Sequence, residues 1–303
     1  ADVARALAEV DTTPFVHPLR GMVRRLLEEL TPPASDSARW LIDATAGALA
    51  ASDARRDPLR PATDSAGLYP QGGMEFVLEL PRLTLVTSPR IDNRLKYDPD
   101  YHGKKDRFVA GRASEAYLAA SWRYFEVFFG TMDRNWGPTE ADGLLLSASP
   151  YNFDHLMLRF GPQRLRLEFV ATQLDPLPLW GTSQPVNRYL SIHRLAVQPS
   201  QRLAFSLTES AVYAQTGGIP RSFEPWYLNP LNLFLLSQED GATTSNALMG
   251  ADVTWRPRGT LRLAAQGYLD DFQVDRRVPT DREPPGYGVT LNASGGLRGG
   301  LIG

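Results

Sequence analysis

The chain has 303 residues, which is enough for one large domain or two ordinary ones. It carries 32 basic and 34 acidic residues without a Lys/Arg-rich run, so we expect no nucleic-acid partner. The absence of cysteine excludes a disulfide framework, thiolate metal sites and cysteine nucleophiles. The four histidines lack metal-ligand spacing, and we expect neither a metal nor a cofactor. No apolar run approaches the roughly 20 residues of a membrane-spanning helix, but a barrel strand needs only about 9–11.

The N-terminal part has a helical pattern, and we predict a helical segment over residues 1–60. One apolar stripe with spacings of three and four comprises Leu19, Met22, Val23, Leu26, Leu27 and Leu30. A weaker stripe comprises Ala38, Leu41, Ile42, Ala46 and Leu49. These helices would form a small bundle or a plug. Residues 54–73, rich in Pro, Gly and charge, are interpreted as a linker to a second domain at 61–303.

From residue 74 onward the pattern has a period of two, as expected of β-strands. Roughly a dozen strands are predicted, joined mostly by short turns with no helical pattern between them, which indicates an antiparallel all-β sheet. Longer polar stretches at 89–114, 175–187, 216–230 and 273–286 separate the hairpins. Short turns alternating with long polar loops are typical of an up-and-down outer-membrane β-barrel.

The hairpin at 246–272 shows why lipid is favoured over a soluble core. One face carries mostly apolar or small residues, among them Ala251, Val253, Trp255, Ala265 and Gly267, and small side chains fill a sandwich core poorly. The other face is polar and suits a barrel lumen, with Asp252, Arg262, Gln266 and Asp270. Trp255, Tyr213 and Tyr189 lie near strand ends, where an aromatic girdle is expected. A large soluble β-protein with one wet face is the alternative.

Several short motifs occur in order over residues 131–272. They are DRNWGP (133–138), LLLSAS (144–149), NRYLSIHRL (187–195), SLTESAVYAQTGG (206–218), YLNPLNLF (227–234) and YLDDF (268–272). Together they resemble the capsule assembly protein Wzi family of bacterial outer-membrane barrels. The resemblance implies a transmembrane barrel of about eighteen strands with a helical segment at its periplasmic end. A dozen strands fall short of that number, so we expect C-terminal strands to be missing.

The same resemblance implies a non-enzymatic role in binding and organising surface capsular polysaccharide. The expected partners are outer-membrane lipid, extracellular polysaccharide and, in one alternative, another envelope protein. In that alternative the barrel is a structural or anchoring subunit, and in another it is a porin-like channel. An enzyme is not expected, because no motif singles out a serine to act with His193.

Eight residues are candidates for polysaccharide binding. Trp136 with Asp133, Arg134 and Asn135 would form a sugar-binding surface if it were exposed, since a flat ring next to hydrogen-bonding groups suits a sugar. The preferred interpretation is structural: Trp136-Gly137-Pro138 forms a turn that ties a loop to the barrel wall.

The other four candidates lie further along the chain. Glu209 interrupts an apolar face, and a lumenal ion pair with an arginine is preferred over ligand contact. Tyr213 precedes a loop. Asp270 and Asp271 are adjacent and would point to opposite faces of a strand, so they would anchor a loop or pair with Arg276 and Arg277, with calcium binding as the alternative.

Overall fold

The computed structural model describes residues 23, 26, 27, 37–55, 65–137, 142–148, 151–178, 185–214, 224–234, 245–257, 261–270 and 286–295. These residues form twelve strands and two short 3-10 helices. The strands are β1 (Arg39–Ala51), β2 (Gly67–Glu79), β3 (Leu83–Asp92), β4 (Gly111–Ser121), β5 (Phe125–Met132), β6 (Phe153–Phe160), β7 (Leu165–Pro178), β8 (Pro185–Ser200), β9 (Leu203–Ala214), β10 (Ser245–Trp255), β11 (Arg262–Asp270) and β12 (Gly286–Ser294). The 3-10 helices are η1 (Asn93–Tyr97) and η2 (Pro225–Leu228).

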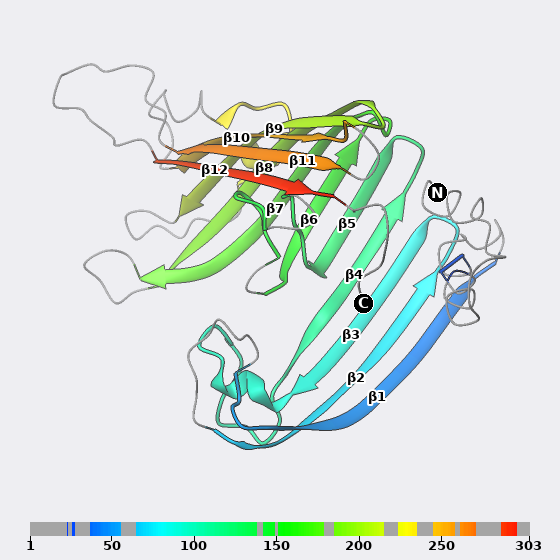
Figure 1. Ribbon diagram of the computed structural model, residues 1–303, viewed down its shortest axis with the longest axis vertical. Helices are drawn as coiled ribbons and strands as arrows, with labels where there is room; N and C mark the ends of the chain where they lie inside the picture. The colour runs from blue at the N-terminus through cyan, green and yellow to red at the C-terminus, as the bar shows by residue number, and fades with distance from the viewer. Residues whose placement is uncertain are drawn as a thin grey trace.

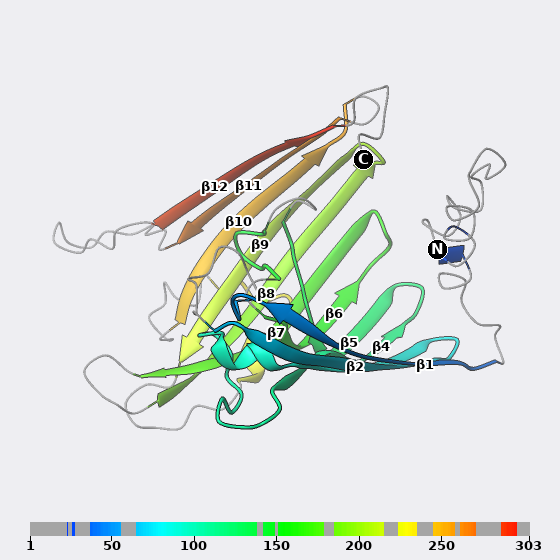
Figure 2. The same cartoon turned by 60° about the horizontal axis from the view of Figure 1, so that its bottom comes forward.

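All twelve strands form one sheet in which each strand pairs antiparallel with the next one along the chain. This confirms the predicted all-β, up-and-down arrangement and the estimate of a dozen strands. The sheet curves strongly, with β1 to β4 on one side and β9 to β12 on the other (Figures 1 and 2). Among the described residues β1 and β12 do not pair with each other, so the sheet is a curved wall rather than a closed barrel.

Short turns and longer connections alternate along most of the sheet, as the sequence predicted. Connections of two to four residues follow β2, β4, β6 and β8, and much longer ones follow β1, β3, β5, β9 and β11, whereas the connections after β7 and β10 are both six residues long. In the β6–β7 turn Gly161 has φ +100°, a conformation that favours glycine. Arg39, the first residue of β1, pairs with Glu79, next to the short β2–β3 turn. β1 therefore begins at the edge of the sheet where the short turns lie, called the short-turn edge, and the opposite edge is called the long-loop edge.

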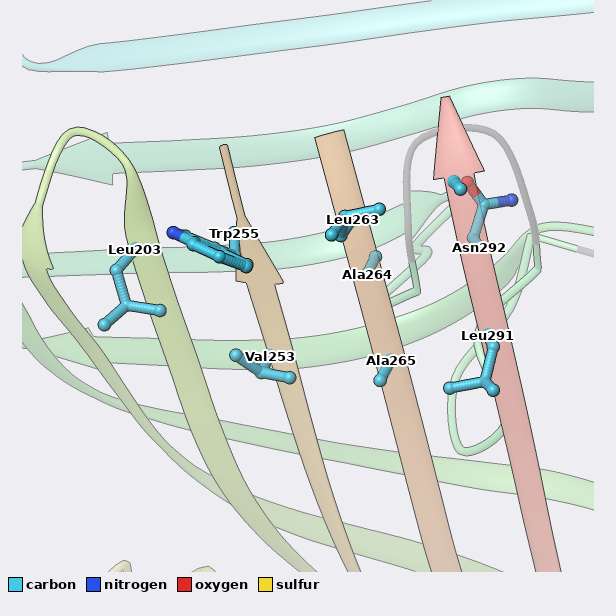
Figure 3. A pocket seen from close by; sticks show the side chains of 9 residues that line it. Leu203, Val253, Trp255, Leu263, Ala264, Ala265, Leu291 and Asn292 are labelled. Atoms are coloured by element: carbon cyan, nitrogen blue, oxygen red, sulfur yellow. The ribbon is translucent and has the colours of Figure 1, made fainter. Parts of the chain in front are cut away.

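The two faces of the sheet differ in chemistry. The convex face exposes large apolar side chains on strand after strand, among them Trp40, Leu68, Phe129, Leu207, Val289 and Leu291. An apolar groove of about 580 Å³ lies on this face and is lined by Leu203, Val253, Trp255, Leu263 and Leu291 among others. Figure 3 shows these side chains on β9 to β12. Asp252 and Gln266 pair with each other on the opposite, concave face, as predicted for the 246–272 hairpin. The convex face is therefore the one suited to lipid.

The structure corrects the prediction of a second N-terminal helix. Residues 39–51 form β1, which pairs with β2 over its whole length. The segment is rich in alanine and fits a period of 3.6 and a period of two equally well, so pairing with β2 decides its conformation. This part of the predicted 1–60 helical segment thus belongs to the sheet.

The predicted linker at 54–73 is also partly wrong, because β2 begins at Gly67. Of the first predicted helix the structure describes Val23, Leu26 and Leu27, which have helical conformation, and the rest lies outside the described residues. Within the described part of the chain, no helix combines the length and apolar character that crossing a membrane requires.

Candidate binding site on the concave face

A ladder of charged side chains crosses the middle of the concave face. Arg159 on β6 pairs with Glu126 on β5 and, at 2.7 Å from Nε to Oε1, with Glu168 on β7. Arg194 on β8 lies 3.5 Å from Glu168 Oε2 and 3.0 Å from Asp252 Oδ2 on β10. Ser206 on β9 accepts a hydrogen bond from Arg194 Nε at 2.9 Å and donates one to Asp252. The ladder links six consecutive strands, from β5 to β10, through partly buried charges.

The connection between β5 and β6 folds back onto this ladder. Residues 133–137 and 142–148, called the inner segment, lie on the concave side of the sheet (Figure 2). Gln266 on β11 accepts a hydrogen bond from Leu144 N at 2.6 Å and donates one to Trp136 O at 3.1 Å. The Arg194 guanidinium lies 5.1 Å from the centroid of the Trp136 ring. The inner segment therefore reaches from β5 across the wall to β11.

The inner segment is anchored from within as well. Asn135 Oδ1 accepts hydrogen bonds from Gly137 N and Gly143 N, both at 2.8 Å, and Trp136 N donates to Leu146 O at 2.9 Å. Leu146 is buried in an apolar cluster that also contains Phe128, Met157, Val170 and Ile192. Trp136 packs against this cluster, so it ties a loop to the wall, as the structural interpretation of the motif expected.

Arg134 belongs to the inner segment and contacts side chains of β5 and β6. Its Nε donates to His155 Nε2 at 2.6 Å, and its guanidinium lies 4.4 Å from the Phe128 ring centroid. Because His155 Nε2 accepts this bond, Nδ1 carries the proton and donates to Phe153 O at 2.9 Å. Burial lowers the pKa of Arg134 to about 10, with a further contribution from the Arg159 charge. Asp133, by contrast, is exposed.

A second polar region lies where β1 to β4 approach the long connections. A cavity of about 440 Å³, called the arginine pocket, opens there. Its lining residues are Thr45, Ala46, Gly47, Gln71, Gly72, Arg90, Ile91, Asp92, Arg94, Leu95, Arg112 and Ser114. Three of these are arginines and one is an acid, so the pocket carries an excess of positive charge.

The three arginines are held differently. Arg94 Nη2 pairs with Asp92 at 3.0 Å, and Asp92 also accepts the Arg94 backbone N–H at the start of η1. Arg112 donates to Asn152 Oδ1 at 2.7 Å and lies over the Tyr151 ring. Arg90 is directly opposite Arg112 in the β3–β4 pair and makes no hydrogen bond or ion pair with the described residues. Like charges opposite each other are unfavourable, and a bound anion would relieve that repulsion.

Two glycines shape the arginine pocket. A Cβ at Gly73 would lie 2.7 Å from Arg90 Cδ, so the missing side chain allows Arg90 to lie along the wall. A Cβ at Gly47 would meet no atom within 4 Å, so this position borders open space. The arginine pocket was not foreseen, because residues 89–114 were interpreted as a polar loop although β3 extends to Asp92 and β4 starts at Gly111.

The eight predicted site residues do not form one site. Arg134, Asn135 and Trp136 lie at the inner segment, and Asp270 accepts a hydrogen bond from Asn246 Nδ2 at 3.0 Å elsewhere on the concave face. Asp271 and its proposed partners Arg276 and Arg277 lie outside the described residues.

Glu209 and Tyr213 lie on the other side of the sheet. The unbroken pairing of β9 with β10 puts Glu209 on the face of the exposed Leu207, so the predicted position in the lumen is wrong. Tyr213 and Tyr189 are also on the convex face, but they are buried and do not form the expected girdle. Trp255 does fit a girdle, since it is exposed at the short-turn edge, together with Trp40, Trp122 and Tyr124.

Comparison with known proteins agrees with the architecture. The family model described as capsule assembly protein Wzi matches residues 72–288, which is most of the chain and spans β2 to β12. A search of curated proteins gives no match. The match covers the sheet from within β2 to within β12, together with the inner segment, and β1 precedes it. The chain therefore belongs to the capsule assembly protein Wzi family of outer-membrane β-barrel proteins.

Proposed function

We propose that this capsule-assembly protein binds capsular polysaccharide without catalysis and that the arginine pocket is the binding site. The observation that carries the proposal is Arg90, whose guanidinium lines a cavity of about 440 Å³ and makes no ion pair with the described residues. Guanidinium groups bind carboxylates and phosphates through paired, charge-assisted hydrogen bonds. We therefore propose that the pocket takes sugar residues that carry a negative charge.

The position of the arginine pocket supports this role. Arg90 and Asp92 lie at the end of β3 that leads into the long β3–β4 connection. In outer-membrane barrels the long loops face the outside of the cell and the short turns face the periplasm. We propose the same orientation here, which places the pocket near the cell surface. Because β1 begins at the short-turn edge, the same orientation places the N-terminal segment in the periplasm.

The test is direct binding of an acidic and a neutral polymer to the purified protein. Polygalacturonate serves as the acidic probe and dextran as the neutral one, measured by titration calorimetry at low salt. Loss of a hydrogen bond to a charged group costs about 1.5–3 kcal/mol, so we expect Arg90→Gln to weaken polygalacturonate binding by about tenfold or more. Arg256→Gln is the matched control, because Arg256 is exposed at the opposite, short-turn edge.

A second pair of variants tests the pocket by filling it. Gly47→Leu projects a side chain into open space in the arginine pocket, whereas Gly267→Leu projects one into open space on the convex face. We expect only Gly47→Leu to block polygalacturonate binding. Equal binding by both variants would place the site elsewhere, and no binding of either polymer by the parent protein would favour an anchoring role.

The porin-like alternative has its own measurement. The inner segment and its ties to β8 and β11 occupy the concave side that a channel would need. We therefore propose that the protein does not conduct, and planar-bilayer recordings with steady open-channel conductance would contradict this.

A further inference from the structure

Part of the convex face is unusually polar for a surface that contacts lipid. Ser191 and His193 on β8 share this face with the exposed Leu195, and Glu209 pairs directly with His193. Ser191 Oγ and His193 Nε2 are buried and have no hydrogen-bond partner among the described residues. Polar groups in contact with hydrocarbon are costly, so this strip needs a cover.

The cover is residues 224–234, called the outer segment. The Tyr227 ring stacks on Tyr213 with centroids 4.0 Å apart, and Phe234 packs against His193 at 4.2 Å. Tyr189, Ala211 and Ala247 complete the buried cluster beneath it. The outer segment thus lies against the convex face and shields its polar strip.

The opposite side of the outer segment is apolar. Leu231 is 79% exposed, Leu233 is 59% exposed and Trp226 is 40% exposed. On β10, two residues beyond the covered Ala247, Met249 is directly opposite Glu209 and is 42% exposed. The exposed apolar surface of β10 therefore continues onto the outer segment, which lies beside it on the convex face.

Several backbone groups of the outer segment have hydrogen-bond partners within the segment itself, three of them in backbone–backbone bonds from Tyr227 N, Asn229 N and Asn232 N. Asn232 Nδ2 donates to Trp226 O at 2.9 Å, and Asn229 Oδ1 accepts from Leu231 N at 3.1 Å. Asn229 Nδ2 donates to Asn232 Oδ1 at 3.0 Å. Irregular backbone is tolerated next to lipid only when its polar groups have such partners, and tryptophan favours the boundary between head groups and acyl chains.

We infer that the outer segment is a membrane-contact surface, in which Trp226, Leu231 and Leu233 contact lipid acyl chains at the membrane boundary near the long-loop edge. The outer segment takes over the lipid contact that Tyr189 and Tyr213 would otherwise make. This inference rests on the outer-membrane location of the protein and is independent of sugar binding.

The absence of cysteine makes a labelling experiment straightforward. Single cysteines replace Trp226, Leu231 or Leu233, carry a nitroxide spin label, and are studied in phosphatidylcholine liposomes. Accessibility to oxygen, which concentrates in lipid, is compared with accessibility to a water-soluble nickel chelate. Leu207→Cys on the bare convex face is the lipid reference, and Phe108→Cys in the β3–β4 connection, 86% exposed, is the water reference.

We expect the oxygen-to-nickel ratio at all three positions to be several-fold above that at position 108 and close to that at position 207. A lipid-like ratio at 207 with water-like ratios at 226, 231 and 233 would overturn the inference. A water-like ratio at 207 itself would overturn the lipid assignment of the whole convex face, so the two failures are distinguishable.

Discussion

The inner and outer segments each cover part of the sheet, the inner segment on the concave face and the outer segment on the convex face. Both belong to long connections, and both fold back onto the wall instead of projecting from it. The inner segment is held by directional contacts, with Gln266 bridging two backbone groups and Arg194 lying on Trp136. The outer segment is held by ring stacking, chiefly of Tyr227 on Tyr213. The concave face offers charges and amides as partners and the convex face offers rings, so each segment matches the face that it covers.

The largest expected effect comes from Arg194→Ala, which removes the centre of the charged ladder. Glu168 is 5% exposed and would lose one of its two arginines, and Asp252 would lose its ion pair. Breaking one partner of a buried ion pair costs about 3–5 kcal/mol. Urea unfolding in detergent measures the change in free energy, with the exposed Arg256→Ala as the control. A loss below about 1 kcal/mol would show that the ladder does not stabilise the concave face.

Tyr227→Ala should act on the outer segment alone. Removing a buried ring costs about 3 kcal/mol, but the cost falls on the contact between the outer segment and β9 rather than on the strand pairing. We expect faster hydrogen exchange in residues 224–234 with an unchanged inner segment.

Tyr227→Phe is the matched control for that variant. The Tyr227 hydroxyl is buried without a hydrogen-bond partner among the described residues, so its removal should be neutral or slightly stabilising. If both variants released the outer segment equally, the hydroxyl rather than ring stacking would hold it.

Gln266→Leu should give the smallest effect of the three, about 2 kcal/mol, because it leaves Leu144 N and Trp136 O without their partner. Hydrogen exchange in residues 142–148 measures the local loss. Gln173→Leu, at an exposed position on β7, provides the control. Unchanged exchange after Gln266→Leu would mean that the apolar cluster around Leu146 is sufficient to hold the inner segment.

Much of the fold was predictable because period-two patterns are local. The strands from β3 onward, the frequent alternation of short and longer connections and the exposed face of the 246–272 hairpin follow from neighbouring residues. The helix expected at Ala38–Leu49 failed although alanine favours helix, because thirteen residues of pairing with β2 outweighed that local preference.

The candidate sites were less predictable, because they depend on contacts between distant residues. Trp136 is linked to Gln266 across 130 positions, and Arg194 to Asp252 across 58. Glu209 was expected inside the barrel because a carboxylate that faces lipid is costly. It lies instead on the convex face, next to the part that the outer segment covers. Nothing in the spacing of Arg90, Arg94 and Arg112 indicates that they border one cavity.

Alternation along a strand is a local property of the backbone, so the amino-acid sequence alone was sufficient to predict an antiparallel sheet with one apolar and one polar face. It also carried the ordered motifs of the capsule assembly family. The three-dimensional arrangement was needed to see which connections fold back, onto which face and against which side chains. Those choices depend on the curvature and register of the whole sheet, which bring the arginine pocket together and place Tyr227 over Tyr213.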